Sequence, residues 1–298
     1  NNDKPNTDTN TSLNFNINEN LMSENNTSSN LHLDFNLTGE SNYLNKSVSE
    51  LVTDAKLSYK TGIDSFTYGL YNWSTQKEDK YTYEANSLKI GEADLETSKF
   101  PYVNIDSTYG REINNEVAEL IKEYFDLYVD SIKLIRDTES IQDMNEKKQA
   151  RWNLNDERIA NNIVKYNAYK NDNILSIVIV EGPITNIGYK YKTFNIDLNT
   201  GKRVNLEEAY KKLGYTQSEL EEDLLKEVSE LVKERCEAND ILDKHEGLMS
   251  YNEKRVVSTI ENDNASYFID ENKNLNIVVM TNQPWGKDNH DILYTVKK

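Results

Sequence analysis

The sequence predicts an α+β fold: an antiparallel β-sheet packed by two main helices, with a polar N-terminal extension. Two observations lead to this class. Apolar residues recur at helical spacing in two long segments, residues 109–136 and 218–237, whereas several shorter segments alternate apolar and polar residues as strands do. The shorter segments also follow one another in runs. A doubly wound sheet would require regular alternation of strands and helices, so an antiparallel sheet is favoured.

The N-terminal extension begins with about 30 residues dominated by Asn, Ser, Thr, Asp and Glu, a composition typical of a tether. Two segments depart from it. Residues 13–17 and 31–37 alternate apolar and polar side chains, which is the pattern of a half-buried strand. We expect these two strands to pair with each other or to add to the edge of the main sheet.

A short helix is predicted next, over residues 47–59, because Ser47 and Glu50 have the spacing of a capping box. Two aromatic-rich segments follow at residues 65–73 and 81–85. We interpret them as strands whose aromatic side chains pack in a core, although exposed aromatic pairs can also bind sugars.

The chain divides, in this interpretation, into a leader and extension at residues 1–86 and an α+β domain at residues 87–298. Within the second part, the helix at 109–136 continues into a charged segment at 137–157, expected to be helix extension and then loop. The remaining expected elements are strands at 163–169, 174–180 and 189–198, helices at 205–210 and 218–237, and strands at 267–269, 275–280 and 292–296.

The charge balance restricts the classes of partner. The formal net charge is −17 and the isoelectric point is about 4.7. Such an acidic surface repels nucleic-acid phosphates and anionic membranes, and it favours encounter with cationic partners. No stretch approaches the roughly 20 apolar residues that span a bilayer. The chain opens Asn-Asn-Asp-Lys-Pro, and we expect this to be a mature or trimmed N-terminus from which a targeting or anchoring segment has been removed.

Patterns associated with catalysis and cofactors are missing from the sequence. The histidines His32, His245 and His290 are scattered without zinc-binding spacing, and there is no Gly-rich phosphate loop or nucleophile elbow. The single cysteine, Cys236, falls in an amphipathic helical segment and is expected to be a buried thiol rather than a nucleophile. We therefore expect no catalytic residue, cofactor or metal.

Two acidic patterns resemble metal-binding or catalytic motifs. Asp270, Asn272 and Asn274 alternate like the first ligands of a calcium loop, but the required Gly and the later Glu are absent, which favours a β-turn. The chain has 51 Asp and Glu residues, so some pair will always resemble that of a glycoside hydrolase. A hydrolase using two carboxylates is accordingly the less favoured alternative.

Two turns with unusual composition are the candidate ligand-contact loops. The first is bounded by Gly182 and Gly188 and is followed by aromatic residues; the second carries Trp285 at its tip. Loops of this kind often bind ligands, although both are also compatible with ordinary connections. The candidate contact residues are Gly182, Pro183, Thr185, Asn186, Tyr189, Tyr191 and Trp285.

From about residue 88 to its end, the chain resembles an extracytoplasmic family of uncharacterised domains. The family is found in lysozyme-sensing bacterial anti-sigma factors and beside the catalytic domain of some peptidoglycan deacetylases. The most specific match is the strand and turn from Lys192 to Lys202, and softer matches are Phe100-Pro101-Tyr102, Ile113-Asn114-Asn115, Leu206 to Tyr210 and Asn274 to Ile277. Members often carry a histidine in the loop before the strand, where this chain has Gly182-Pro183-Ile184-Thr185.

The resemblance implies a binding or sensing domain on the outer face of the cell envelope, anchored to the surface as a lipoprotein or an anti-sigma-like ectodomain, or secreted. It implies no catalysis by this domain. The expected partner is a cationic protein such as lysozyme or a peptidoglycan fragment. The alternative is an accessory domain of a peptidoglycan-modifying enzyme. An Asn-rich, Lys-rich and Pro-poor composition is also common in Gram-positive bacteria. The oligomeric state is left open.

Overall fold

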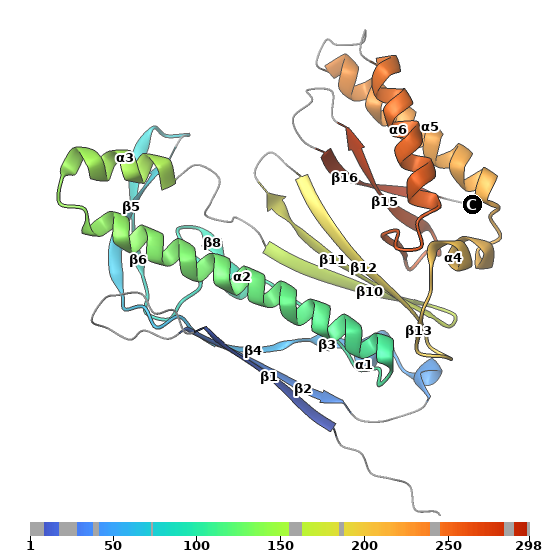
Figure 1. Ribbon diagram of the computed structural model, residues 1–298, viewed down its shortest axis with the longest axis horizontal. Helices are drawn as coiled ribbons and strands as arrows, with labels where there is room; N and C mark the ends of the chain where they lie inside the picture. Colours follow the sequence, from blue (N-terminus) through green and yellow to red (C-terminus); the bar gives the residue numbers. More distant parts are fainter. Residues whose placement is uncertain are drawn as a thin grey trace, which may run out of the picture.

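The computed structural model describes residues 9–17, 29–37, 42–72, 74–154, 163–184, 188–238, 245–282 and 289–296. They form helices and small antiparallel sheets, which confirms the predicted α+β class. In Figure 1 the long helix α2 (Thr108–Ser140) crosses the molecule between the N-terminal strands and a central sheet. Helices α5 (Gln217–Ala238) and α6 (His245–Ile260) cover a third sheet at the opposite end.

The N-terminal strands β1 (Thr9–Ile17) and β2 (Ser29–Leu37) pair with each other, as predicted for the two alternating segments. β2 also pairs with β4 (Lys56–Lys60), so the sheet order is β1-β2-β4. Leu31 and Leu33 on β2 are buried in the first core of the protein. The N-terminal extension therefore contributes a packed sheet to the fold.

The helix predicted over residues 47–59 is wrong beyond its first turn. The capping box is present, with the Ser47 N–H donating to the Glu50 carboxylate at 2.7 Å, but helix α1 covers only Val48–Leu51. Strands β3 (Val52–Asp54) and β4 follow, because pairing with β9 (Pro101–Val103) and β2 satisfies their main chain. Tertiary pairing outweighs a local cap when the helix is this short.

The aromatic segments form the hairpin β5 (Phe66–Asn72) and β6 (Lys77–Tyr83), and buried Tyr68 and Tyr83 confirm that they pack in a core. Trp73 lies outside the described residues. The short strands β7 (Lys89–Ile90) and β8 (Ala93–Asp94) and the 3-10 turns at Tyr43–Asn45 and Leu95–Thr97 complete this region. The loop predicted towards residue 157 is instead helix α3 (Met144–Leu154) up to Leu154.

The central sheet has the order β10-β11-β12-β13 and packs against α2. Its strands are β10 (Ile163–Asn171), β11 (Ile174–Ile184), β12 (Gly188–Asp197) and β13 (Lys202–Arg203). Alternate β11 residues such as Ile177 share one buried core with the apolar stripe of α2 and with residues of the N-terminal region. This core includes residues from both sides of position 86.

The third sheet has the order β14-β15-β16 and belongs to a second core. It consists of β14 (Tyr267–Ile269), β15 (Leu275–Asn282) and β16 (Asn289–Val296), and α4 (Leu206–Lys212), α5 and α6 also contribute side chains to this core. The sequence patterns predict α5 and the strands but not α6. Cys236 on α5 is buried, as expected.

Polar side chains of β11 and β12, of which Ser176 and Asn195 are buried, join the central sheet to the third sheet. The Asn195 side-chain amide donates to the Tyr267 carbonyl at 2.8 Å, and the Tyr267 N–H donates to the Thr193 hydroxyl at 2.9 Å. The Ile269 N–H donates to the Ser176 hydroxyl at 3.1 Å. These bonds satisfy the main chain of the short strand β14, and they hold the segment just before it beside β12.

Candidate functional site

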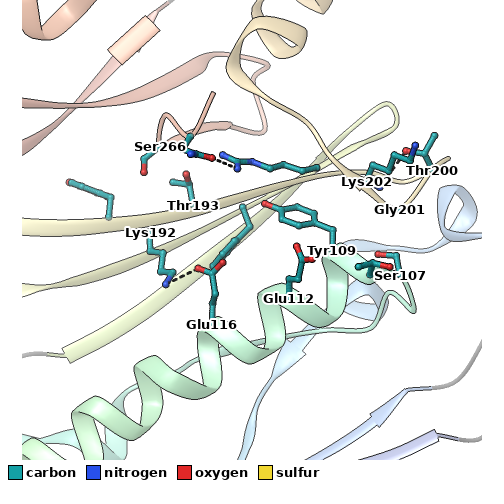
Figure 2. A pocket seen from close by; sticks show the side chains of 15 residues that line it. Ser107, Tyr109, Glu112, Glu116, Lys192, Thr193, Thr200, Gly201, Lys202 and Ser266 are labelled. Carbon is teal, nitrogen blue, oxygen red and sulfur yellow. Dashed lines mark hydrogen bonds and ion pairs between the residues drawn. The ribbon is translucent and has the colours of Figure 1, made fainter. Parts of the chain in front are cut away.

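A cleft of about 670 Å³ lies where α2, β12 and the segment before β14 meet. Figure 2 shows side chains entering it from the first turns of α2, from β12 and its following turn, and from Ser266. The lining combines aromatic, hydroxyl and charged groups of both signs. It comprises Ser107, Thr108, Tyr109, Glu112, Glu116, Tyr191, Lys192, Thr193, Phe194, Thr200, Gly201, Lys202, Arg203, Asn264 and Ser266.

One end of the cleft is fixed by close packing of a turn on the start of α2. Ser107 caps the helix, its hydroxyl accepting from the Gly110 N–H at 2.9 Å. Gly201 has φ +65°, and a Cβ added there would lie 2.6 Å from the Cβ of Ser107. Only glycine permits both this backbone conformation and this approach, so the turn that carries Lys202 is held against the helix N-terminus.

The charged groups of the cleft are unequally partnered. The Lys192 ammonium and the Glu116 carboxylate form an ion pair at 2.9 Å. Arg203 donates to the Asn264 side chain and, at 3.0 Å, to the Asp263 carbonyl, which ties β13 to the segment before β14. Within the described part of the chain, Glu112 and Lys202 have no ion-pair partner, and both are exposed.

Aromatic rings form part of the cleft wall. Burial raises the pKa of Tyr109 to about 12, and the Asn195 N–H donates to the Tyr109 hydroxyl. The Lys192 ammonium lies 5.8 Å from the centre of the buried Phe194 ring. The cleft therefore offers an apolar ring surface beside hydrogen-bonding groups, which is the usual construction of a small-ligand site.

The predicted contact residues are only partly placed. Tyr191 lines the cleft, and its ring lies 6.5 Å from that of Tyr189, which is 49% exposed. Gly182, with φ 150°, lies at an irregularity in the β11–β12 pairing, and Pro183 belongs to β11. The remaining candidates, Thr185, Asn186 and Trp285, lie outside the described residues, so a surface formed by both turns stays a prediction.

The sequence patterns do not indicate the contribution of α2 to the site. Ser107, Tyr109 and Glu112 meet β12 only through the packing of the helix on the sheet, and helical periodicity does not report that. A signal did exist for the other wall. The segment from Lys192 to Lys202, which carries the most specific family resemblance, supplies much of the cleft lining.

The calcium-like segment is a self-contained turn. The Asp270 carboxylate accepts from the Asn272 and Asn274 N–H groups and from the Asn274 and Asn276 side chains. Burial acts to raise the pKa of Asp270, but these hydrogen bonds outweigh it and lower the pKa. No cluster of three or more potential metal ligands occurs among the residues that the structure describes.

A second cleft, of about 650 Å³, lies between α5 and β16. Its α5 wall carries the carboxylates Asp223, Glu227, Glu230 and Glu234 together with Lys226. The β16 wall is formed by residues 293–296. The lining is predominantly acidic, in keeping with the net charge of the chain.

Comparisons with protein-family models, with curated proteins and with solved structures found no match for this chain. The family resemblance of the Lys192–Lys202 segment is therefore a hypothesis about function. In the described part of the chain, none of the helices is both long and apolar enough to cross a membrane.

Proposed function

We propose that this chain is a ligand-binding module of the bacterial cell envelope, located outside the cytoplasm and either anchored or secreted. Its site is the cleft between α2 and β12, and its ligand is a peptidoglycan fragment. The observation that carries the proposal is the lining of this cleft, where the Tyr109 and Phe194 rings stand beside hydroxyl, amide and oppositely charged groups. A fragment that combines sugar rings with a charged peptide requires such a mixture.

The family resemblance supports the same cleft independently of its composition. The matched segment from Lys192 to Lys202 forms one wall and the turn at one end. Only glycine fits at position 201 beside Ser107, so this contact gives a structural reason for the glycine in the matched segment. A binding role for the domain would place its distinguishing residues at the ligand, and the matched segment lines the cleft that we propose as the site.

Binding without turnover is part of the proposal. The two carboxylates of the cleft, Glu112 and Glu116, project from one face of the same helix, and Glu116 is paired with Lys192. Glycoside hydrolases place their two carboxyl groups on either side of the scissile bond. Product analysis after long incubation with peptidoglycan distinguishes the alternatives: released fragments would establish the hydrolase.

The test is a titration of isotope-labelled protein with a disaccharide-peptide from peptidoglycan and with a glycan chain that lacks peptide. We expect amide shifts in the first turns of α2 and in residues 191–203. The variant Lys202→Glu should weaken binding, whereas Lys77→Glu, on β6, should not. Absence of shifts, or shifts confined to other surfaces, would overturn the proposal.

A second candidate ligand is a cationic protein of the lysozyme kind. The acidic cleft between α5 and β16 favours it, because a basic surface could be steered there by the charge of −17. Replacing Asp223, Glu227 and Glu230 together by their amides should reduce the association rate at low salt, and this reduction should vanish at high salt. An unchanged rate would exclude this surface.

The accessory-domain alternative differs in what accompanies the domain, since it requires a peptidoglycan-modifying catalytic domain in the same protein. The sequence of the whole gene decides it. The binding experiments above apply equally to both arrangements.

A further inference from the structure

The cleft contains an interrupted sheet edge. β13 consists only of Lys202 and Arg203, which pair with Asp197 and Ile196 of β12. The Val204 N–H makes one more bond, to the Asn195 carbonyl at 2.9 Å, and the chain then leaves for α4. Among the described residues, those of β12 before Asn195 therefore have no paired strand on the β13 side, and the cleft begins at this position.

The alternation of the strand sets which main-chain groups face this edge. The carbonyls of Asn195 and Asp197 accept bonds from the β13 side, at Val204 and Gly201. Main-chain groups two residues apart on a strand point to the same side, so the N–H and carbonyl of Thr193 also point towards the cleft. Within the described residues, no main-chain hydrogen bond reaches Thr193 from that side.

Tyr109 shows how this edge is closed at its inner end. Its hydroxyl accepts the Asn195 N–H, the first donor that β13 leaves unpaired. Thr193 is the next outward-facing residue along the strand. Its hydroxyl is already used by the Tyr267 N–H, but this bond engages the side chain and leaves the main chain available.

We propose that the cleft binds a short extended peptide, which adds to β12 as an antiparallel strand in line with β13 and directs a basic side chain towards Glu112. The inference rests on the proposed function in taking this cleft as the binding site. It goes further by assigning the floor of the cleft to the peptide part of a ligand rather than to a sugar. Strand addition derives affinity from main-chain bonds and specificity from alternate side chains.

The dimensions agree with a short segment. Ser107 and Glu116 mark the two ends of the α2 wall, and nine helical rises of about 1.5 Å separate them by about 14 Å. At about 3.3 Å per strand residue, this length accommodates about four residues. The cleft is therefore matched to a tetrapeptide or to an exposed extended segment of a larger molecule.

The charge expected for the peptide side chain that faces α2 follows from the ion pairs already present in the cleft. Glu116 is paired with Lys192, whereas Glu112 has no ion pair within the described residues. A strand in the cleft alternates its side chains between the α2 wall and the Asn264–Ser266 wall. A basic side chain on the α2 side would complete the pairing of Glu112, and the opposite side would meet amide and hydroxyl groups.

The experiment uses the whole chain with three synthetic tetrapeptides of sequence Ala-Lys-Ala-Ala, blocked at both ends. One is unmodified, one is N-methylated at residues 1 and 3, and one at residues 2 and 4. N-methylation removes main-chain donors from one edge of an extended peptide at a time. The unmodified peptide should bind, one methylated isomer should retain its affinity, and the other should lose about tenfold or more, as expected for lost hydrogen bonds and a steric clash.

Each other outcome overturns the inference. Equal affinity of all three peptides shows that no strand edge is used, and loss of binding by both isomers shows that the ligand is contacted on both edges. If the peptides fail while the peptide-free glycan binds at the cleft, the proposed function stands and the inference falls. If the peptides, the glycan and the disaccharide-peptide all fail, the proposed function falls as well.

A charge exchange tests the role of Glu112 with a matched control. Glu112→Lys should weaken binding of the lysine peptide about tenfold and should favour a peptide with glutamate in the same position. Glu119→Lys, which makes the same change at an exposed α2 residue outside the cleft lining, should leave both affinities unaltered. Equal effects of the two variants would remove Glu112 from the site.

Discussion

The side-chain amide of Asn195 donates a hydrogen bond to the main-chain carbonyl of Tyr267 at 2.8 Å, and both residues are buried. This bond joins β12 of the central sheet to β14 of the third sheet. The same residue of β12 uses its main-chain N–H to bond Tyr109 at the cleft. Asn195 thus connects the packing of two sheets with the geometry of the candidate site.

Replacing Asn195 by alanine should destabilise the protein and loosen the cleft together. The Tyr267 carbonyl would lose a buried partner, which costs about 1–3 kcal/mol. Urea denaturation measures the change, and Asn199→Ala, in the exposed turn after β12, is the matched control with an expected change below about 0.5 kcal/mol. Equal destabilisation by both variants would contradict a special role for the buried amide.

A methyl group at Gly201 should disturb the end of the cleft. Gly201→Ala places a Cβ 2.6 Å from that of Ser107 and in a backbone region with φ +65°, so we expect a loss of about 1–3 kcal/mol. Ligand affinity at the cleft should fall as the turn moves away from α2.

Gly247 provides the control for this substitution. It lies in helix α6 with nothing within 4 Å of an added Cβ, so Gly247→Ala should stabilise the protein by about 0.5–1 kcal/mol. Thermal unfolding of both variants gives the comparison. The same sign of change for both would show that the close contact at Ser107 is unimportant.

Sequence patterns predicted the fold class because its largest signals are local. The stripe of α2, from Ile113 to Ile135, and the alternation of β2, from Leu31 to Leu37, depend on residues close together in the chain. The failures have non-local causes. Residues 52–59 follow a sound capping box yet form strands, since their partners are β9 and β2, far away in sequence.

The candidate site was less predictable for a related reason. Glu112 and Thr193 lie far apart in the sequence, with strands β10 and β11 between them. They line one cleft only because α2 packs on β12. The sequence does identify Tyr191 and the turn at Gly201. It does not reveal that β13 ends after Arg203, although this termination exposes the edge of β12.

The ion pair of Arg151 with Glu139 should make stability depend on acid. The two side chains are mostly buried, and Arg151 donates two hydrogen bonds to the Glu139 carboxylate, from Nη2 at 2.6 Å and from Nε at 2.9 Å. The Gly69 N–H also donates to Glu139. Burial acts to raise the pKa of Glu139, but the bonds from Arg151 and Gly69 outweigh it and lower the pKa. A depressed pKa contributes stability above the ordinary value of 4.5, and this stability is lost as pH falls through the lower folded value.

Two variants test this ion pair. Arg151→Leu should cost about 2–4 kcal/mol at neutral pH, since it leaves the mostly buried Glu139 without its cation. Arg151→Lys should recover only part of the loss because an ammonium cannot reproduce the bidentate contact. The difference between the wild type and Arg151→Leu should shrink below pH 4.5 in urea titrations. A difference that is constant with pH would contradict the ionic account.

Tyr109 should titrate at unusually high pH and weaken the fold as it does so. Burial raises its pKa to about 12, with Glu116 adding to the rise while Arg203 and the Asn195 N–H oppose it. A raised folded pKa contributes stability that is complete below the ordinary value of 10.0 and is lost as pH rises through about 12. The tyrosinate absorbance of the wild type minus that of Tyr109→Phe should have a midpoint near pH 12, and the variant should lose stability less steeply over this range.

Tyr128→Phe, at another tyrosine with a pKa of about 12, serves as the control. A ligand in the cleft should shift the titration of Tyr109 and leave that of Tyr128 unchanged. A difference midpoint near 10, or equal ligand effects at both tyrosines, would contradict the placement of Tyr109 in the cleft wall.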